Sequence, residues 1–170
     1  MRYTDVIWDF NGTLLDDAGA GLACVEELLR RRGLPPLGSL ARYREVFRFP
    51  IRDYYTDIGF DFSREPYEAL ADEWALLYDE LAAAAPLRAG VPETLKRLKR
   101  AGVRLTVLSA SEHVMLCRQL RQRGVYGLFD EVLGLGDFRA QDKLGIAREW
   151  CARTRPARAL MIGDTDHDAL

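Results

Sequence analysis

The sequence has few cysteines and no apolar segment long enough to cross a membrane. Its 170 residues include 3 cysteines, widely separated and without a Cys-x-x-Cys pair, which argues against a disulfide framework and a zinc site. A membrane-spanning helix needs about 20 apolar residues in succession. The N-terminal MRYTDVIWDF carries an acid where a signal peptide is apolar. We therefore expect a soluble, cytoplasmic protein with no membrane partner and with buried or half-buried thiols.

An excess of charge of one sign is also missing. The chain has 24 Lys and Arg against 26 Asp and Glu, for a formal net charge of −2. The acids gather in residues 1–85 and the bases in residues 86–170, but neither half is basic enough to predict nucleic-acid binding. With 48% hydrophobic residues, the composition is that of a globular protein able to bury a core, and it excludes disordered and low-complexity classes.

Strand and helix patterns alternate through much of the chain. Short apolar patterns typical of buried strands occur at residues 3–10, 103–108, 129–133 and 159–162, and helical patterns separate the last three. Strands joined by helices of this length predict right-handed βαβ units in a parallel sheet. The predicted fold class is therefore α/β, with a doubly wound, Rossmann-like parallel sheet as its core.

The middle third of the chain differs from its flanks. Residues 34–86 contain no segment that resembles a buried strand, whereas residues 40–47 and 65–85 have helical composition, and the region is acidic. We therefore expect this third of the chain to be mostly helical and different in kind from its flanks.

Three of the strand patterns end on a polar residue that small or turn-forming residues follow. These polar residues are Asp9 in VIWDFNGT, Ser109 in LTVLSAS and Asp164 in LMIGDTDHD. Because ligands of open parallel sheets bind beyond the carboxyl ends of the strands, we expect the three to converge. Lys143 begins the helix before the last strand. Two carboxylates, a hydroxyl, a lysine and a glycine turn are suited to a phosphate group and a hard divalent cation.

The motif order DFNGT, LSAS, Lys143 and GDTDHD resembles the haloacid dehalogenase superfamily, whose members are mostly phosphatases. The segments PLRAGVPETLKRLKRAGVRLTVLSAS and FRFPIRDYYTDIGF resemble its phosphoglycolate phosphatase-like branch. That family inserts a helical cap domain at the place that the helical middle third occupies here. The resemblance implies a Mg²⁺-dependent phosphohydrolase that acts on a small phosphorylated metabolite. It also implies a split α/β core of residues 1–17 and 87–170, with residues 18–86 inserted as the cap.

The resemblance also implies roles for individual residues. Asp9 is the nucleophile, which forms an aspartyl-phosphate that water then hydrolyses, and the implied catalytic set is Asp9, Asn11 and Lys143. Mg²⁺ binds Asp9, the backbone carbonyl of Asn11 and Asp164, and Asp168 orients the metal shell. The implied phosphate-binding set comprises Asn11, Gly12, Thr13, Ser109, Ala110 and Lys143.

Asn11 departs from the family pattern, which has a second Asp at this position to protonate the leaving group and deprotonate the attacking water. An amide forms hydrogen bonds but does not exchange a proton in this way. Four explanations stay open: a substrate with a good leaving group, a replacement acid among Asp16, Asp17, His113 and His167, binding of a phosphorylated ligand without turnover, or an engineered change. We favour a slow or specialised phosphatase, with a binding or regulatory protein as the alternative.

The helical insertion offers two candidates for contact with the substrate. Arg48 and Arg52 lie where the family's caps meet the substrate and would bind a second anionic group, with simple surface charge as the alternative.

Neither the identity of the substrate nor the oligomeric state is readable from the motifs. Dehalogenation is a third possible activity, although that chemistry needs no metal. Residues 168–170 fall where a helix should begin, so we expect the C-terminal part of the family's core to be missing.

Overall fold

The computed structural model describes residues 2–136, 143–165 and 168. The chain divides into two compact units. The core unit comprises Met1–Asp16 and Pro86–Leu170, and the helical unit comprises Asp17–Ala85. We describe each unit by itself.

The core unit is built on a parallel sheet whose four strands lie in the order β3-β2-β1-β4. The strands are β1 (Asp5–Trp8), β2 (Arg104–Glu112), β3 (Glu131–Leu135) and β4 (Ala159–Ile162). Every pairing is parallel, and the first strand of the chain lies between β2 and β4. The sheet therefore confirms the predicted doubly wound α/β fold.

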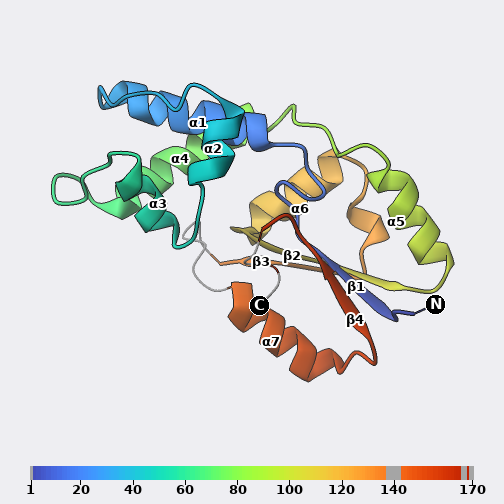
Figure 1. The fold of residues 1–170 in the computed structure, drawn as a ribbon. Coiled ribbons are helices and arrows are strands. Elements are labelled where there is room, and N and C mark those ends of the chain that lie inside the picture. Colours follow the sequence, from blue (N-terminus) through green and yellow to red (C-terminus); the bar gives the residue numbers. More distant parts are fainter. Residues whose placement is uncertain (1, 137–142, 166–167, 169–170) are drawn as a thin grey trace. The chain divides into compact units, whose positions relative to one another are not determined.

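Helices cover both faces of this sheet. The helices are α5 (Val91–Arg100), α6 (His113–Gln122) and α7 (Lys143–Thr154), with a short 3-10 turn at Tyr126–Leu128. The helices α5 and α6 lie on one side of the strands and α7 lies on the other (Figure 1).

Side-chain alternation along the strands explains the two covered faces. Ile7 and Leu108 are buried together with Trp150 of α7. Val6 and Trp8, the neighbours of Ile7, contribute instead to the apolar surface that α5 lines. Because successive side chains of a strand point to opposite faces, a nearly continuous apolar strand such as β1 is expected where both faces are covered.

The carboxyl end of β2 differs from the expectation. The predicted strand ends at Ser109, whereas β2 continues to Glu112 because its pairing with β3 resumes there after a register shift. The side chain of Glu112 then caps α6 by accepting hydrogen bonds from the N–H groups of Val114 and Met115. Ser109 therefore lies inside the strand rather than at its end.

The thiols only partly follow the expected burial. Cys24 and Cys117 are buried, but Cys151 is exposed on α7, which corrects the expectation for that residue. Across the described ranges, no helix combines the length and the apolar character that crossing a membrane requires.

The helical unit contains four helices and no strand among its residues, all of which are described. They are α1 (Ala18–Arg31), α2 (Leu40–Val46), α3 (Ile51–Asp57) and α4 (Tyr67–Leu81). The unit has a core of its own that is rich in aromatic rings. The buried members of this core are Val25, Leu28, Leu29, Tyr54, Tyr55, Phe60 and Leu70.

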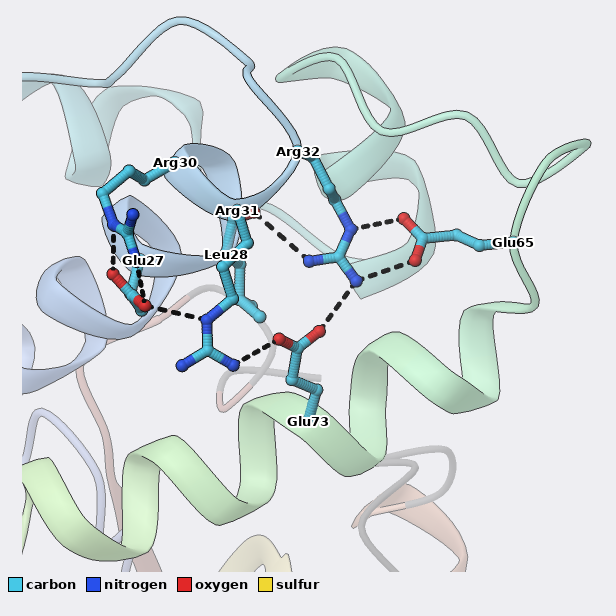
Figure 2. Close-up of polar contacts among 7 residues, drawn as sticks. All are labelled: Glu27, Leu28, Arg30, Arg31, Arg32, Glu65 and Glu73. Carbon is cyan, nitrogen blue, oxygen red and sulfur yellow. Dashed lines mark hydrogen bonds and ion pairs between the residues drawn. The ribbon is translucent and has the colours of Figure 1, made fainter.

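The basic end of α1 is tied to acids within the same unit (Figure 2). Arg32 donates to both carboxylate oxygens of Glu65 and, at 2.8 Å, to Glu73. Arg31 bridges Glu73 of α4 and Glu27 of α1. Partly exposed ion pairs contribute little singly, but this network links α1 to α4 through several charges. Each of the three consecutive arginines, Arg30–Arg32, therefore has an acidic partner within the helical unit.

Candidate active site

The turn after β1 positions the first acidic residue of the site. Asp9 follows the last residue of β1, and its N–H donates to the carbonyl of Ile162 in β4 at 2.9 Å. The carbonyl of Phe10 accepts from both Leu14 and Leu15 at 2.9 Å, which closes the turn that carries the Asn-Gly-Thr sequence. Asp9 is only 7% exposed, so its carboxylate is removed from most of the solvent at the carboxyl end of the central strand.

A buried lysine links two of the acids. The ammonium of Lys143, the first residue of α7, donates to Oδ1 of Asp9 at 2.5 Å and also to Oδ1 of Asp168. The other oxygen of Asp168 accepts from the hydroxyl of Thr165 at 2.9 Å and from its N–H at 3.2 Å. Segments 134 residues apart in the chain therefore meet at one charged cluster.

A third acid completes the cluster. Asp164 accepts a hydrogen bond of 3.0 Å from the hydroxyl of Thr13. Carboxylate oxygens of Asp9, Asp164 and Asp168 all lie within 4.8 Å of one another. Three carboxylates around one ammonium carry more negative than positive charge, and carboxylate oxygens are the ligands that a hard divalent cation prefers. The donor set therefore fits Mg²⁺.

The pKa values of two acids in the cluster, Asp9 and Asp168, are shifted in opposite directions. Burial raises the pKa of Asp9 to about 7, against the lowering effect of Lys143, and the charges of Asp168 and Asp164 raise it further. Burial also disfavours ionisation of Asp168, but the hydrogen bond and charge of Lys143 and the bonds from Thr165 hold its pKa below the usual range. Positive charge beside Asp9 therefore decides whether it is available as a carboxylate.

Gly12 permits a close approach within the cluster. Its φ is +73°, and a Cβ at this position would lie 2.7 Å from Cγ of Asp164. No side chain fits between the turn and the carboxylate, and the positive φ adds strain for any residue other than glycine. The glycine of the Asn-Gly-Thr turn is therefore required by both the space and the backbone.

We expect Gly12→Ala to destabilise the protein by about 2 kcal/mol and to weaken Mg²⁺ binding, because it strains the backbone and displaces Asp164. The matched control is Gly102→Ala, whose φ of +77° carries the same strain but whose Cβ would meet nothing within 4 Å. Chemical unfolding and Mg²⁺ titration by calorimetry measure the two effects. Equal Mg²⁺ affinity in the two variants contradicts the close-approach argument.

The side chain of Asn11 lies against β2. Its amide oxygen accepts from the hydroxyl of Ser111 at 2.7 Å and from that of Ser109 at 3.3 Å. Ser109 Oγ lies 3.1 Å from Ser111 Oγ and accepts from the N–H of Ser111 at 3.1 Å. Ala110, between the two serines, is half-buried. Sequence analysis missed Ser111, which comes into reach only because β2 extends past Ser109.

Arg88 is a second residue that sequence analysis missed. Its Nε donates to the backbone carbonyl of Gly12 at 2.5 Å, and its Nη2 lies 3.7 Å from Oδ1 of Asp16. The guanidinium thereby fixes the turn from a segment 76 residues further along the chain. The only sequence signal was that Arg88 belongs to the PLRAG segment.

Three of the four residues considered as a replacement acid for Asn11 are described by the structure, and each has a contact of its own. In the helical unit, Asp17 is buried and accepts a hydrogen bond from the hydroxyl of Tyr78. In the core unit, Asp16 faces Arg88 as described, and His113 contacts the thiol of Cys117 at 3.5 Å. His167 lies outside the described residues.

The two arginines predicted to meet the substrate have partners inside the helical unit. Arg48 forms an ion pair with Asp57 at 2.7 Å and lies 3.7 Å from Asp53. The guanidinium of Arg52 lies 5.4 Å from the centre of the Phe62 ring. Their contact with a substrate stays a prediction.

The fold and the site together define an α/β protein with an acidic, lysine-bearing site at the carboxyl ends of parallel strands. The family model described as haloacid dehalogenase-like hydrolase matches residues 6–170, and the chain belongs to that family. This confirms the predicted family membership.

Individual relatives agree with the family but differ in what their names state. Tyrosine-protein kinase PtkA of Mycobacterium tuberculosis is 30% identical over 175 residues, which cover 96% of this chain and 56% of the relative. Phosphoglycolate phosphatase of Xanthomonas campestris is 29% identical over 178 residues, which cover 97% of this chain and 76% of the relative. The chain thus spans little more than half of the first relative's length.

Solved structures show the same fold. The structure of Mycobacterium tuberculosis PtkA superposes with a TM-score of 0.82 at 27% identity, covering 99% of this chain and 78% of that one. A haloacid dehalogenase-like hydrolase from Streptococcus pneumoniae superposes with a TM-score of 0.80 at 16% identity, covering 98% of this chain and 78% of that one. The second likeness supports the fold alone.

Proposed function

We propose that the chain is a Mg²⁺-dependent phosphohydrolase that acts on a small phosphorylated metabolite through an aspartyl-phosphate at Asp9. The observation that carries this proposal is the cluster in which Lys143 contacts Asp9 and Asp168 while the carboxylate of Asp164 lies beside them. A buried carboxylate with a fixed ammonium is a nucleophile held in place. The named activities of several relatives, phosphoglycolate phosphatases among them, point in the same direction.

The chain's own residues supply the steps of the reaction. A carboxylate oxygen of Asp9 attacks phosphorus, and the bond from phosphorus to the leaving oxygen breaks with its electron pair going to that oxygen. Lys143 favours the ionised form of Asp9 and orients its carboxylate through a hydrogen bond and its charge. The hydroxyl of Ser109 and the N–H groups of the turn after Asp9 bind the phosphoryl oxygens. The oxygen of water then attacks phosphorus, the bond from phosphorus to Asp9 breaks with its electron pair returning to the carboxylate, and phosphate is released.

The carboxylates of Asp9, Asp164 and Asp168 would hold the cation, together with the backbone carbonyl of Asn11. When bound, Mg²⁺ offsets the repulsion between an anionic nucleophile and an anionic substrate. The fit rests on the donor set, since among the described residues of the cluster the three carboxylates outnumber the ammonium of Lys143.

The substrate class follows from the family and from the organisation of the chain. We propose that the helical unit acts as the cap that selects the substrate and excludes water from the reaction. Arg48 and Arg52 are the candidates for binding a second anionic group of a small metabolite. A binding protein that does not turn its ligand over is the second candidate function, and the specific feature that favours it is Asn11 in the place of an acid.

We expect wild-type protein to release phosphate from p-nitrophenyl phosphate and from members of a metabolite panel with Mg²⁺ present, and to lose this activity in EDTA. Inorganic phosphate is measured directly, with heat-denatured protein as the blank. Activity that survives EDTA contradicts metal dependence. Ligand- and Mg²⁺-dependent thermal stabilisation without phosphate release from any substrate supports the binding protein instead.

A further inference from the structure

We propose that the chain becomes phosphorylated on Asp9 faster than it releases the phosphate, so that the aspartyl-phosphate protein persists. This inference rests on the function proposed above and deepens it. Its source is the chemistry of Asn11 and of the side chains around it. The matching substrates are phosphate esters and anhydrides whose leaving group is a stable anion, such as aryl and acyl phosphates.

Two hydrogen bonds of the Asn11 side chain come from serine hydroxyls, which do not act as a general acid or base near neutral pH. The hydroxyls of Ser111 and Ser109 lie 2.7 and 3.3 Å from its amide oxygen, and Ser109 is only 1% exposed. An amide and two hydroxyls donate and accept hydrogen bonds, but none of them ionises near neutral pH. The same holds if the Asn11 amide is rotated so that its nitrogen, rather than its oxygen, faces the two serines, because the nitrogen does not ionise either.

Three ionisable side chains near these segments have partners of their own in the described part of the core unit. Asp16 faces the guanidinium of Arg88. Both carboxylate oxygens of Glu112 accept from N–H groups of α6, at 2.8 and 2.7 Å. His113 contacts Cys117 one turn further along the same helix. Each of these groups would have to leave its partner in order to act as the general acid or base in place of Asn11.

Formation of the phosphoenzyme needs no acid when the leaving group is stable as an anion. The bond from Asp9 to phosphorus forms as the bond from phosphorus to the leaving oxygen breaks, and the electron pair goes to that oxygen. A phenolate or a carboxylate leaves in this way without a proton. An alkoxide does not, so alkyl phosphates are expected to react poorly.

Breakdown of the phosphoenzyme does need a base. The oxygen of water forms a bond to phosphorus, the bond from phosphorus to Asp9 breaks, and one proton must leave the attacking water. General acid–base catalysis contributes about 10²–10⁴-fold to such steps. Without it, hydrolysis becomes the slow step while phosphorylation by an activated donor stays fast, and the phosphorylated protein accumulates.

Rapid mixing of wild-type protein with excess p-nitrophenyl phosphate and Mg²⁺ tests the inference. We expect a burst of about one p-nitrophenolate per chain, then a steady rate slower than the burst by about 10²-fold or more. Intact-protein mass spectrometry after acid quench should show one added phosphoryl group. Hydroxylamine should remove it, as it does from acyl phosphates but not from phosphate esters.

Two variants of Asn11 separate proton transfer from other effects. Asn11→Asp supplies the missing acid, so we expect the burst and the mass increase to disappear and the steady rate to rise by about 10²-fold or more. Asn11→Ala removes the hydrogen bonds but supplies no base, so molecules of this variant that become phosphorylated should keep the added mass, whatever the rate at which they form. Because Asn11 is the only asparagine of the sequence and precedes a glycine, deamidation is checked by mass in each preparation.

The outcomes distinguish this inference from the function on which it rests. Rapid multiple turnover by the wild type, with no burst and no added mass, overturns persistence but leaves the phosphohydrolase standing. Absence of both phenolate release and added mass, with aryl and acyl phosphates alike, overturns the proposed function itself.

Discussion

Asp9→Asn is expected to lower Mg²⁺-dependent phosphate release by about 10⁴-fold or more, because an amide does not attack phosphorus in place of the carboxylate. Asp9 is the acid of the cluster that lies at the end of the central strand β1 and contacts Lys143. The amide is nearly the same size, so packing around the position should survive. Phosphate release with p-nitrophenyl phosphate, with and without Mg²⁺, measures the loss.

The matched control is Asp72→Asn, which makes the same chemical change at an exposed position on α4. Its phosphate release should equal that of the wild type. Circular dichroism and chemical unfolding of both variants establish that each is folded before activities are compared. Substantial Mg²⁺-dependent release by folded Asp9→Asn means that another residue is the nucleophile.

Where local sequence determines conformation, the backbone around the candidate site was predictable. The apolar pattern of β1 followed by Asn-Gly-Thr predicted a strand that ends beside Asp9, and the structure places a turn there. The prediction for Lys143 depended on the order of the motifs, since a lysine at a helix start has no distinctive pattern of its own. The structure brings it to Asp9 across 134 residues.

Where distant pairing determines conformation, the sequence was insufficient. Residues 109–112 are polar or small and resemble the start of a helix, yet pairing of Glu112 with Leu135 holds them in β2. Tertiary pairing thus outweighs local preference, and this extension brings Ser111 to Asn11. Arg88 was missed for a similar reason, because its contact with the Gly12 carbonyl depends on how two distant segments meet.

Lys143→Met is expected to destabilise the metal-free protein by about 3 kcal/mol at pH 8, because it leaves the carboxylates of Asp9 and Asp168 without their shared ammonium. The control is Lys99→Met, which removes an ion pair to Asp130 whose two side chains are each 38% exposed. That pair should contribute less than about 1 kcal/mol. Chemical unfolding of both variants in EDTA gives the free energies, and equal losses contradict a special role for Lys143.

The pH dependence of this loss has a definite sign. Burial raises the pKa of Asp9 from 3.8 to about 7 in the folded protein, so the folded state binds the proton more tightly than the unfolded state does. The resulting stabilisation is fully present below pH 4 and is lost as pH rises toward 7. Removing Lys143 removes the charge that opposes the rise and moves the folded pKa of Asp9 higher still. The cost of Lys143→Met should therefore be smaller at pH 5, where Asp9 is mostly protonated with or without Lys143, than at pH 8, where the wild type has the ion pair to lose. A cost that is the same at both values would show that Asp9 does not respond to Lys143.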